Sequence, residues 1–188
     1  AAYKGHLEIA KTLMSAEKRY TPRCFGHAAM IEATKNGLVD MMKILIEAKI
    51  SLTLRPGYFD SLVQLAVAQG HTAAVETLLA QMAPRCRSYF YLEKAHNTAA
   101  EHGDLPMLKL LLGHPKCRAF PYERKYVNCA LRLATTKGHY LYVNELLNAG
   151  ASVTTDLDGD SLLMIATRNG HLNLVELLLQ RGALVNSR

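Results

Sequence analysis

The sequence has no tryptophan and only four cysteines in 188 residues: Cys24, Cys86, Cys117 and Cys129. None of them forms a Cys-x-x-Cys pair, so the spacing favours reduced thiols over a disulfide framework. No run approaches the roughly 18 uncharged apolar residues that a membrane span needs, and no secretory signal pattern opens the chain. We therefore expect a cytoplasmic protein that makes no use of a membrane.

The sequence also lacks the short motifs of common enzyme classes. Gly-x-Ser-x-Gly, a Walker loop, Gly-x-Gly-x-x-Gly and His-Glu-x-x-His are all absent. Asp156 to Asp160 is similar to a calcium loop, but the downstream bidentate glutamate is not in register. We predict that these residues form no enzyme active site and hold no metal or cofactor.

The net charge is +6, which is modestly basic. Such a balance favours an acidic partner or a phosphate, although solubility alone would also explain it.

An internal repeat is the main feature that is present. A small residue followed four positions later by glycine occurs six times, at Ala1/Gly5, Ala33/Gly37, Ala66/Gly70, Ala99/Gly103, Ala134/Gly138 and Ala166/Gly170. The intervals between successive alanines are 32, 33, 33, 35 and 32 residues. A period of this length is typical of a repeat protein, in which each unit buries its apolar face against its neighbours.

Each unit carries two apolar segments on either side of its glycine. Apolar residues recur four, five, eight and nine positions after the glycine, which places them on one face of a helix. In this stripe, Leu45, Leu78, Leu111, Leu146 and Leu178 should form one inner seam. We also interpret Met30, Met41, Met42, Met107 and Met164 as core residues. The unit is therefore a helix, a glycine turn, a helix and a loop.

Local signals agree with this unit. Asp104 stands where a helix N-cap belongs and Pro106 follows in the first turn. Gly150 and Gly182 fall where helices should end.

A period near 33 with Gly-His between two helices resembles the ankyrin repeat. The best match runs from Asp158 to Asn186, and the resemblance covers nearly the whole chain. The family's Thr-Pro-Leu-His signature is intact nowhere, and Gly-His is replaced at Gly37-Leu38 and Gly103-Asp104. The resemblance implies an all-α solenoid of about six helix-turn-helix units with short finger loops.

We expect a single array over residues 1–188. Its units would cover roughly residues 1–22, 23–55, 56–88, 89–123, 124–155 and 156–188. The pattern lacks polar capping units at both ends, so we expect a truncated array with neighbouring repeats or domains in the full protein.

Four histidines (His6, His71, His139 and His171) directly follow a turn glycine. They could be read as metal ligands. However, equivalent residues of stacked helices lie about 10 Å apart, which is too far for one metal with Zn–N bonds of about 2.0–2.1 Å. We therefore predict that each bonds to the backbone of its own or the next unit.

The joints between units combine basic and aromatic residues. Phe25, Tyr58, Tyr91 and Tyr126 share one repeat position just before the inner helix, and stacking would align them in a column. The rings could simply pack against the neighbouring finger, or they could form a binding surface, since tyrosine and arginine dominate interface hot spots. The candidate partner-binding residues are Arg55, Tyr58, Phe59, Arg85, Arg87, Tyr89, Tyr91, Arg118, Tyr122, Arg124, Tyr126, Lys35, Lys137 and Arg168.

We interpret the chain as a protein–protein interaction module, a scaffold or adaptor that binds a partner through finger loops and the concave inner-helix surface. The basic charge favours an acidic partner. One alternative is a surface that binds nucleic acid or a phosphate ligand through basic and aromatic residues. A second is the recognition arm of a larger enzyme or of a bacterial effector acting in host cytosol. Fold alone does not choose between them.

Overall fold

The structure is a computed structural model that describes residues 8, 12, 23–48, 58–81, 90–114, 123–154 and 160–185. Within these residues it contains ten helices and no β-strand, as expected for an all-α protein. The chain divides into two compact units, residues 1–91 and 92–188. The predicted finger loops lie largely outside the described residues.

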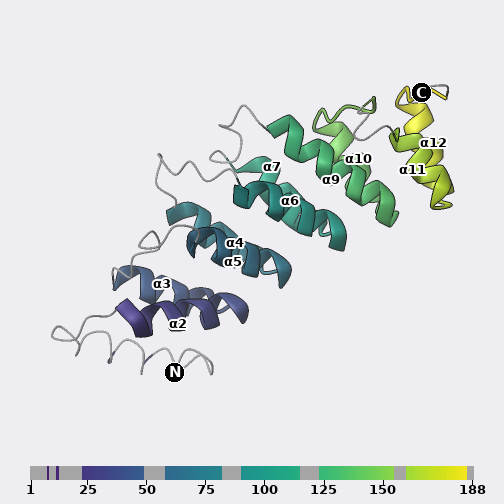
Figure 1. The fold of residues 1–188 in the computed structure, drawn as a ribbon. Coiled ribbons are helices and arrows are strands. Elements are labelled where there is room, and N and C mark those ends of the chain that lie inside the picture. The colour runs from purple at the N-terminus through teal and green to yellow at the C-terminus, as the bar shows by residue number, and fades with distance from the viewer. Residues whose placement is uncertain are drawn as a thin grey trace. The chain divides into compact units, whose positions relative to one another are not determined.

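Unit 1 contains two helix pairs: α2 (Arg23–Lys35) with α3 (Val39–Glu47), and α4 (Tyr58–Ala68) with α5 (Thr72–Gln81). The helices of each pair contact one another, and like helices stack, α2 against α4 and α3 against α5 (Figure 1). We call α2 and α4 inner helices and α3 and α5 outer helices.

Unit 2 contains three pairs: α6 (Phe90–His102) with α7 (Leu105–Gly113), α9 (Glu123–Lys137) with α10 (Tyr140–Asn148), and α11 (Leu162–Arg168) with α12 (Leu172–Gln180). The inner helices α9 and α11 are in contact, and so are the outer helices α7, α10 and α12 in succession. Both units therefore have the two-layer stack that the repeat predicts.

The core follows the predicted apolar stripe. Within unit 1, Leu45 and Leu78 are fully buried, and within unit 2 the same holds for Leu111, Leu146 and Leu178. Each inner helix also buries the alanine that stands four residues before its glycine. A side chain larger than alanine would not fit where two inner helices approach closely, because protein interiors are close-packed.

One prediction about the core is wrong. Met30, Met41, Met42 and Met107 are buried as expected, but Met164 of α11 is 43% exposed. Met164 stands two residues before the repeated alanine. The equivalent residue of α2, Ile31, is 40% exposed as well. The same position is partly buried in α4, α6 and α9, so an apolar residue type there does not by itself indicate full burial.

The alanine–glycine spacing is explained by helix termination. The N–H group that follows each described turn glycine donates to the carbonyl of the alanine five residues earlier, at 2.8–3.0 Å. The glycines themselves have φ between +65° and +80°. This is the Schellman arrangement, in which a left-handed residue ends the helix and satisfies its last carbonyl groups.

The predicted division of the chain into units stays a prediction, and the described helices can be placed against its ranges. The five helix pairs fall within the ranges from 23–55 to 156–188, but α9 begins at Glu123, one residue before the range 124–155. The aromatic position expected before the inner helix lies inside it, since Tyr58 is the first residue of α4 and Tyr126 the fourth of α9. Of the first predicted unit, only Glu8 and Thr12 are described, and both are helical.

Candidate functional site

Three of the repeated histidines bond to the backbone of the preceding helix pair. The Nε2 atoms of His71, His139 and His171 lie 3.1, 2.9 and 3.0 Å from carbonyl oxygens of Lys35, Glu101 and Thr136. A carbonyl oxygen can only accept, so each Nε2 carries a proton and donates it. Bonding to backbone is confirmed, but the expected partner is wrong: the carbonyls belong to the preceding pair, and not to the histidine's own unit or the next one. His6 lies outside the described residues.

The same rings cover the turn glycines of the preceding pairs. A Cβ atom added to Gly37, Gly103 or Gly138 would lie 2.7–2.9 Å from the nearest atom of the histidine ring. Because the ring both contacts the turn and bonds the last inner-helix turn, it fixes the end of one inner helix from the next pair. Side chains at these ends therefore project from an ordered backbone.

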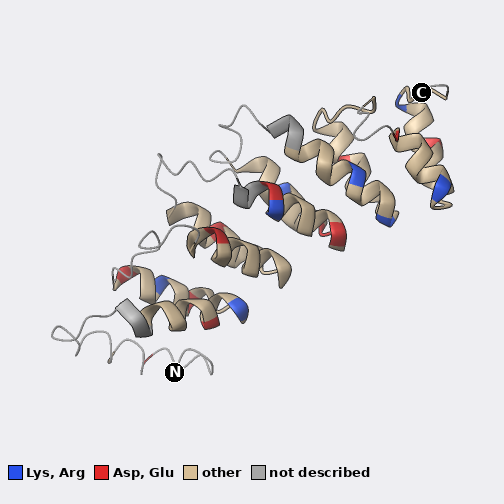
Figure 2. Ribbon diagram, in the orientation of Figure 1, with Lys and Arg blue, Asp and Glu red and all other residues tan. Residues whose placement is uncertain are grey.

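Basic residues occupy several of these inner-helix ends. Lys35, Lys137 and Arg168 stand in the last turns of α2, α9 and α11 (Figure 2), and all three are exposed. The end of α4 has no basic residue, and α6 ends with Glu101 and His102. The surface at these ends is thus polar and mostly basic.

Arg168 also has a partner within its own helix pair. Its two terminal nitrogens donate to both carboxylate oxygens of Asp160, at 2.7 and 3.1 Å. This hydrogen bonding lowers the pKa of Asp160 below its usual value. The Arg168 side chain remains 62% exposed, so it can still contact a partner. The two parallel hydrogen bonds to Asp160 hold its guanidinium group in one orientation.

Two of the candidate aromatic residues pack within unit 1. Tyr58 is half-buried, and its hydroxyl donates to the backbone carbonyl of His27 at 3.0 Å. Its ring meets the His27 ring edge-on with centroids 4.8 Å apart, and burial raises the pKa of Tyr58 to about 12. The neighbouring Phe59 is only 6% exposed. The contacts of Tyr58 join α4 to α2, whereas Tyr126 of α9 is partly exposed.

The remaining candidates are not located by the structure. Arg55, Arg85, Arg87, Tyr89, Arg118 and Tyr122 lie outside the described residues. Tyr91 and Arg124 belong to α6 and α9, but their side chains are not described. The aromatic column and the basic finger surface therefore stay predictions.

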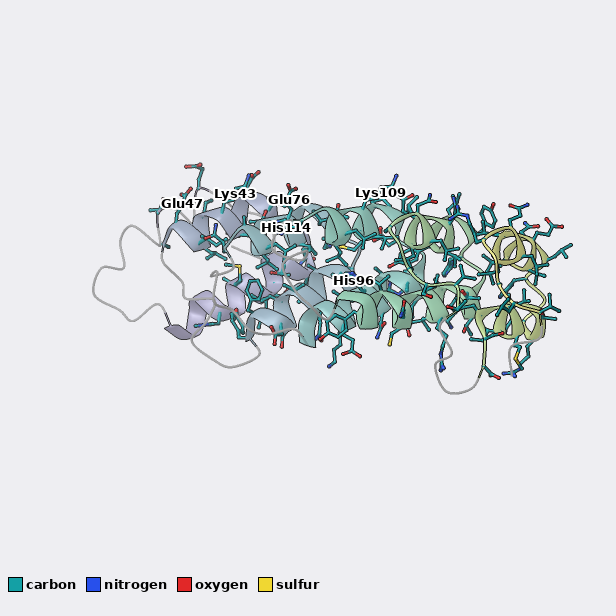
Figure 3. All side chains as sticks on the ribbon, turned by 90° about the horizontal axis from the view of Figure 1, so that it is seen from above. Lys43, Glu47, Glu76, His96, Lys109 and His114 are labelled. Atoms are coloured by element: carbon teal, nitrogen blue, oxygen red, sulfur yellow. The ribbon has the colours of Figure 1, made fainter. Side chains whose placement is uncertain are left out.

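One buried histidine in unit 2 was not predicted from the sequence. His96 of α6 is 5% exposed, and its Nδ1 atom is buried with no hydrogen-bond partner. Figure 3 shows the ring between the two helix layers. Burial lowers the pKa of His96 to about 4, because a charged imidazole is disfavoured where water is excluded. Tyr142 lies alongside and donates its hydroxyl to the His96 carbonyl at 3.3 Å.

The repeat contains a signal for this burial. His96 stands three residues before Ala99, and the same position in the other four described inner helices is always apolar, namely Met30, Val63, Leu131 and Leu163. The register of the repeat therefore assigns residue 96 to the core. Burial also raises the pKa of Tyr142, with a further contribution from the negative charge of Asp104.

The described residues contain neither a metal cluster nor a membrane span. No group of three or more His, Cys, Asp or Glu side chains in this part of the chain is arranged to hold a metal ion. None of the described helices combines the length and the apolar character needed to cross a bilayer.

Known proteins show the same architecture. A family model described as ankyrin repeats (3 copies) matches residues 1–89 and 95–188. The chain therefore belongs to the ankyrin repeat family, whose helical solenoids generally serve as protein–protein interaction modules and non-enzymatic scaffolds.

Two individual proteins add detail. The crystal structure of the human ASB11 ankyrin repeat domain superposes with a TM-score of 0.71 at 24% identity, covering 100% of this chain and 84% of that one. The ankyrin repeat and KH domain-containing protein mask-1 of Caenorhabditis elegans is 35% identical over 88 residues, which is 47% of this chain. The match spans only 3% of the length of mask-1. The first likeness establishes the fold, and the second places part of this chain beside a short stretch of a much longer protein.

Proposed function

We propose that this chain binds an acidic protein partner through the ends of its inner helices together with the basic joints between units. The observation that carries the proposal is the histidine bridge, because it orders the backbone from which Lys35 and Lys137 project. An ordered surface loses little conformational entropy when it binds. The hydrogen bonding between Arg168 and Asp160 supports the proposal further, because it already orients the guanidinium group of Arg168.

The proposal includes a cytoplasmic location and no catalytic role for these residues. The sparse cysteines, none in a Cys-x-x-Cys pair, support the location. The family's general use as a scaffold supports the absence of chemistry.

Charge reversal at the joints provides the main test. Replacing Arg85, Arg87 and Arg124 with glutamate should lower partner capture at least about tenfold, because rim charges of the wrong sign repel an acidic surface. The measurement is capture of soluble proteins on the immobilised chain, quantified by mass spectrometry for the wild type and the triple variant. Equal recovery of every captured protein would remove the joints from the binding surface.

A second variant tests the inner-helix ends separately. Lys35→Glu combined with Lys137→Glu changes two exposed residues and should also weaken capture. The melting temperature of both variants should stay within about 2 °C of the wild type, since exposed substitutions change stability little. Lys109, which is exposed on the outer helix α7, offers a matched control when replaced by glutamate.

Nucleic acid is the competing partner, and the same variants address it. Stacking of bases requires exposed rings, and Phe59 is buried while the Tyr58 hydroxyl is engaged with α2. These two positions therefore favour a protein partner. A labelled single-stranded RNA that binds at low salt and is released steeply at moderate salt would instead support the nucleic-acid alternative.

A further inference from the structure

The outer helices of unit 1 enclose a groove that the repeat did not predict. It has a volume of about 450 Å³ and lies between α3 and α5. Val39 and Ile46 line it from α3, and Ala73 and Ala80 line it from α5. A volume of this size is within the range of ligand-binding clefts, which is about 300–1,000 Å³.

Small side chains on α5 keep the groove open. Ala73 and Ala80 stand three and ten residues after the turn glycine Gly70, and both are exposed. The same positions of α12 hold Asn173 and Gln180. Two alanines in place of longer side chains leave unfilled space along the contact between the outer helices.

The charges around the groove are mostly negative, although the whole chain has a net charge of +6. Glu47, Glu76 and Lys43 line the groove, and Asp40 is exposed nearby on α3. Figure 3 shows Lys43, Glu47 and Glu76 pointing outward on the same side of α3 and α5. None of these four charges forms an ion pair with any part of the chain that the structure describes. The two glutamates that line the groove can therefore pair with a cation supplied from outside.

Unit 2 contains an example of a cation held at the equivalent place. Between α10 and α12, Arg181 donates to the side-chain oxygens of Asn144 and Asn148 at 2.7 and 2.8 Å. Arg181 stands eleven residues after its turn glycine, and the corresponding residue of α5 is Gln81. The acceptor Asn148 corresponds to Glu47 of α3, whereas the acceptor Asn144 corresponds to Lys43. Hence the α3–α5 groove keeps one of the two acceptor positions for a guanidinium group, has a lysine at the other, and lacks the arginine.

We propose that the groove between α3 and α5 docks an amphipathic helix of a partner protein that carries apolar residues and arginine. Its apolar side chains lie against Ala73 and Ala80, and its arginine pairs with Glu47 and Glu76. Recognition of a helix in a groove relies on anchors spaced three, four and seven residues apart. The carboxylates select arginine because a guanidinium can donate two parallel hydrogen bonds.

This site differs from the surface under "Proposed function" in both place and charge. That surface lies at inner-helix ends and takes an acidic partner, whereas the groove lies on outer helices and takes a basic one. Variants of one should leave the other unaffected, so either proposal can fail alone.

The probe is a fluorescein-labelled helical peptide of about 16 residues, roughly four turns, made of leucine, alanine and arginine. Its leucines follow the spacing of three and four, and arginines flank them. Binding to the full chain is followed by fluorescence anisotropy, and the site is located by NMR of labelled alanine methyl groups. We expect saturable binding with shifts at Ala73 and Ala80. The variant A73N/A80Q, which introduces the side chains found in α12, should bind at least tenfold more weakly.

Two further variants separate shape from charge. Q81R supplies the missing arginine from within and should compete with the peptide, and E47Q/E76Q should weaken binding about three- to tenfold and flatten its dependence on salt. Ala28→Gln, at an exposed alanine of α2, is the matched control and should bind like the wild type. A peptide with glutamate in place of arginine should bind much more weakly.

Three results would overturn the proposal: unchanged binding to A73N/A80Q, equal binding of the glutamate and arginine peptides, or methyl shifts confined to residues outside α3 and α5. Unaltered circular dichroism of each variant shows that the helices remain folded.

Discussion

Replacing Gly138 with alanine is expected to lower the free energy of unfolding of unit 2 by about 2–3 kcal/mol. Gly138 has φ +80°, a conformation that costs an L-residue roughly 1–2 kcal/mol. The new Cβ would also lie 2.7 Å from Cε1 of His171. The ring must then move and lose its bond to the Thr136 carbonyl, which costs about 1 kcal/mol more.

The chain provides a matched control for this clash. Gly170 has nearly the same backbone, with φ +73°, but nothing lies within 4 Å of its added Cβ. Gly170→Ala should therefore cost only about 1–2 kcal/mol, the conformational part alone. In the double variant G138A/H171A the clash is gone, so the two single effects should not add.

Hydrogen exchange of the α9–α12 amides is the appropriate measurement, because repeat arrays open locally and do not always unfold as one. The free energy of opening is read separately for each helix. Equal losses for G138A and G170A would show that the His171 ring does not pack on the turn.

Acidification is expected to destabilise unit 2 through His96. The pKa of His96 is about 4 in the folded chain and about 6.5 when unfolded. Between these values the unfolded chain binds a proton that the folded chain does not, so stability falls as the pH is lowered. The contribution is complete above about pH 6.5 and is lost progressively down to about pH 4, amounting to about 3 kcal/mol.

The control for His96 comes from the other helix pairs of unit 2. Leucine occupies the same position at Leu131 and Leu163 and is buried there, so His96→Leu should fit and should remove the titration. The Tyr142 hydroxyl bonds the backbone of residue 96 and is retained. Exchange of the α6 amides, corrected for intrinsic rates, should show a pH-dependent loss in the wild type and a much smaller one in the variant. Identical pH profiles would show that another group causes the loss.

The repeat period predicted most of the fold because it depends on local geometry. The spacing from Ala134 to Gly138 is one helical turn and a left-handed cap, and both follow from backbone sterics. The backbone bonding of the histidine after the glycine was likewise predictable. His139 and His171 occupy equivalent positions of successive repeats and make equivalent bonds.

The site was predicted less completely, for identifiable reasons. For Tyr58 the sequence left open whether the ring packs against its neighbour or forms a binding surface, and in the structure its ring and hydroxyl both engage α2. Met164 was expected in the core, but it is 43% exposed, whereas the same position is partly buried in α4, α6 and α9. Residue type indicates what a side chain can do, whereas its contacts depend on how the next pair of helices approaches.

The sequence by itself determined that the chain repeats a pair of helices, that glycines end the inner helices and that histidines bind the backbone, since each follows from spacing along one chain. Tertiary structure alone decided which carbonyls those histidines reach and which rings turn inward. It also decided that two alanines on α5 line a groove together with Glu47 and Glu76. These features arise between helices of successive repeats, where the side-chain volumes on both helices determine which groups come into contact.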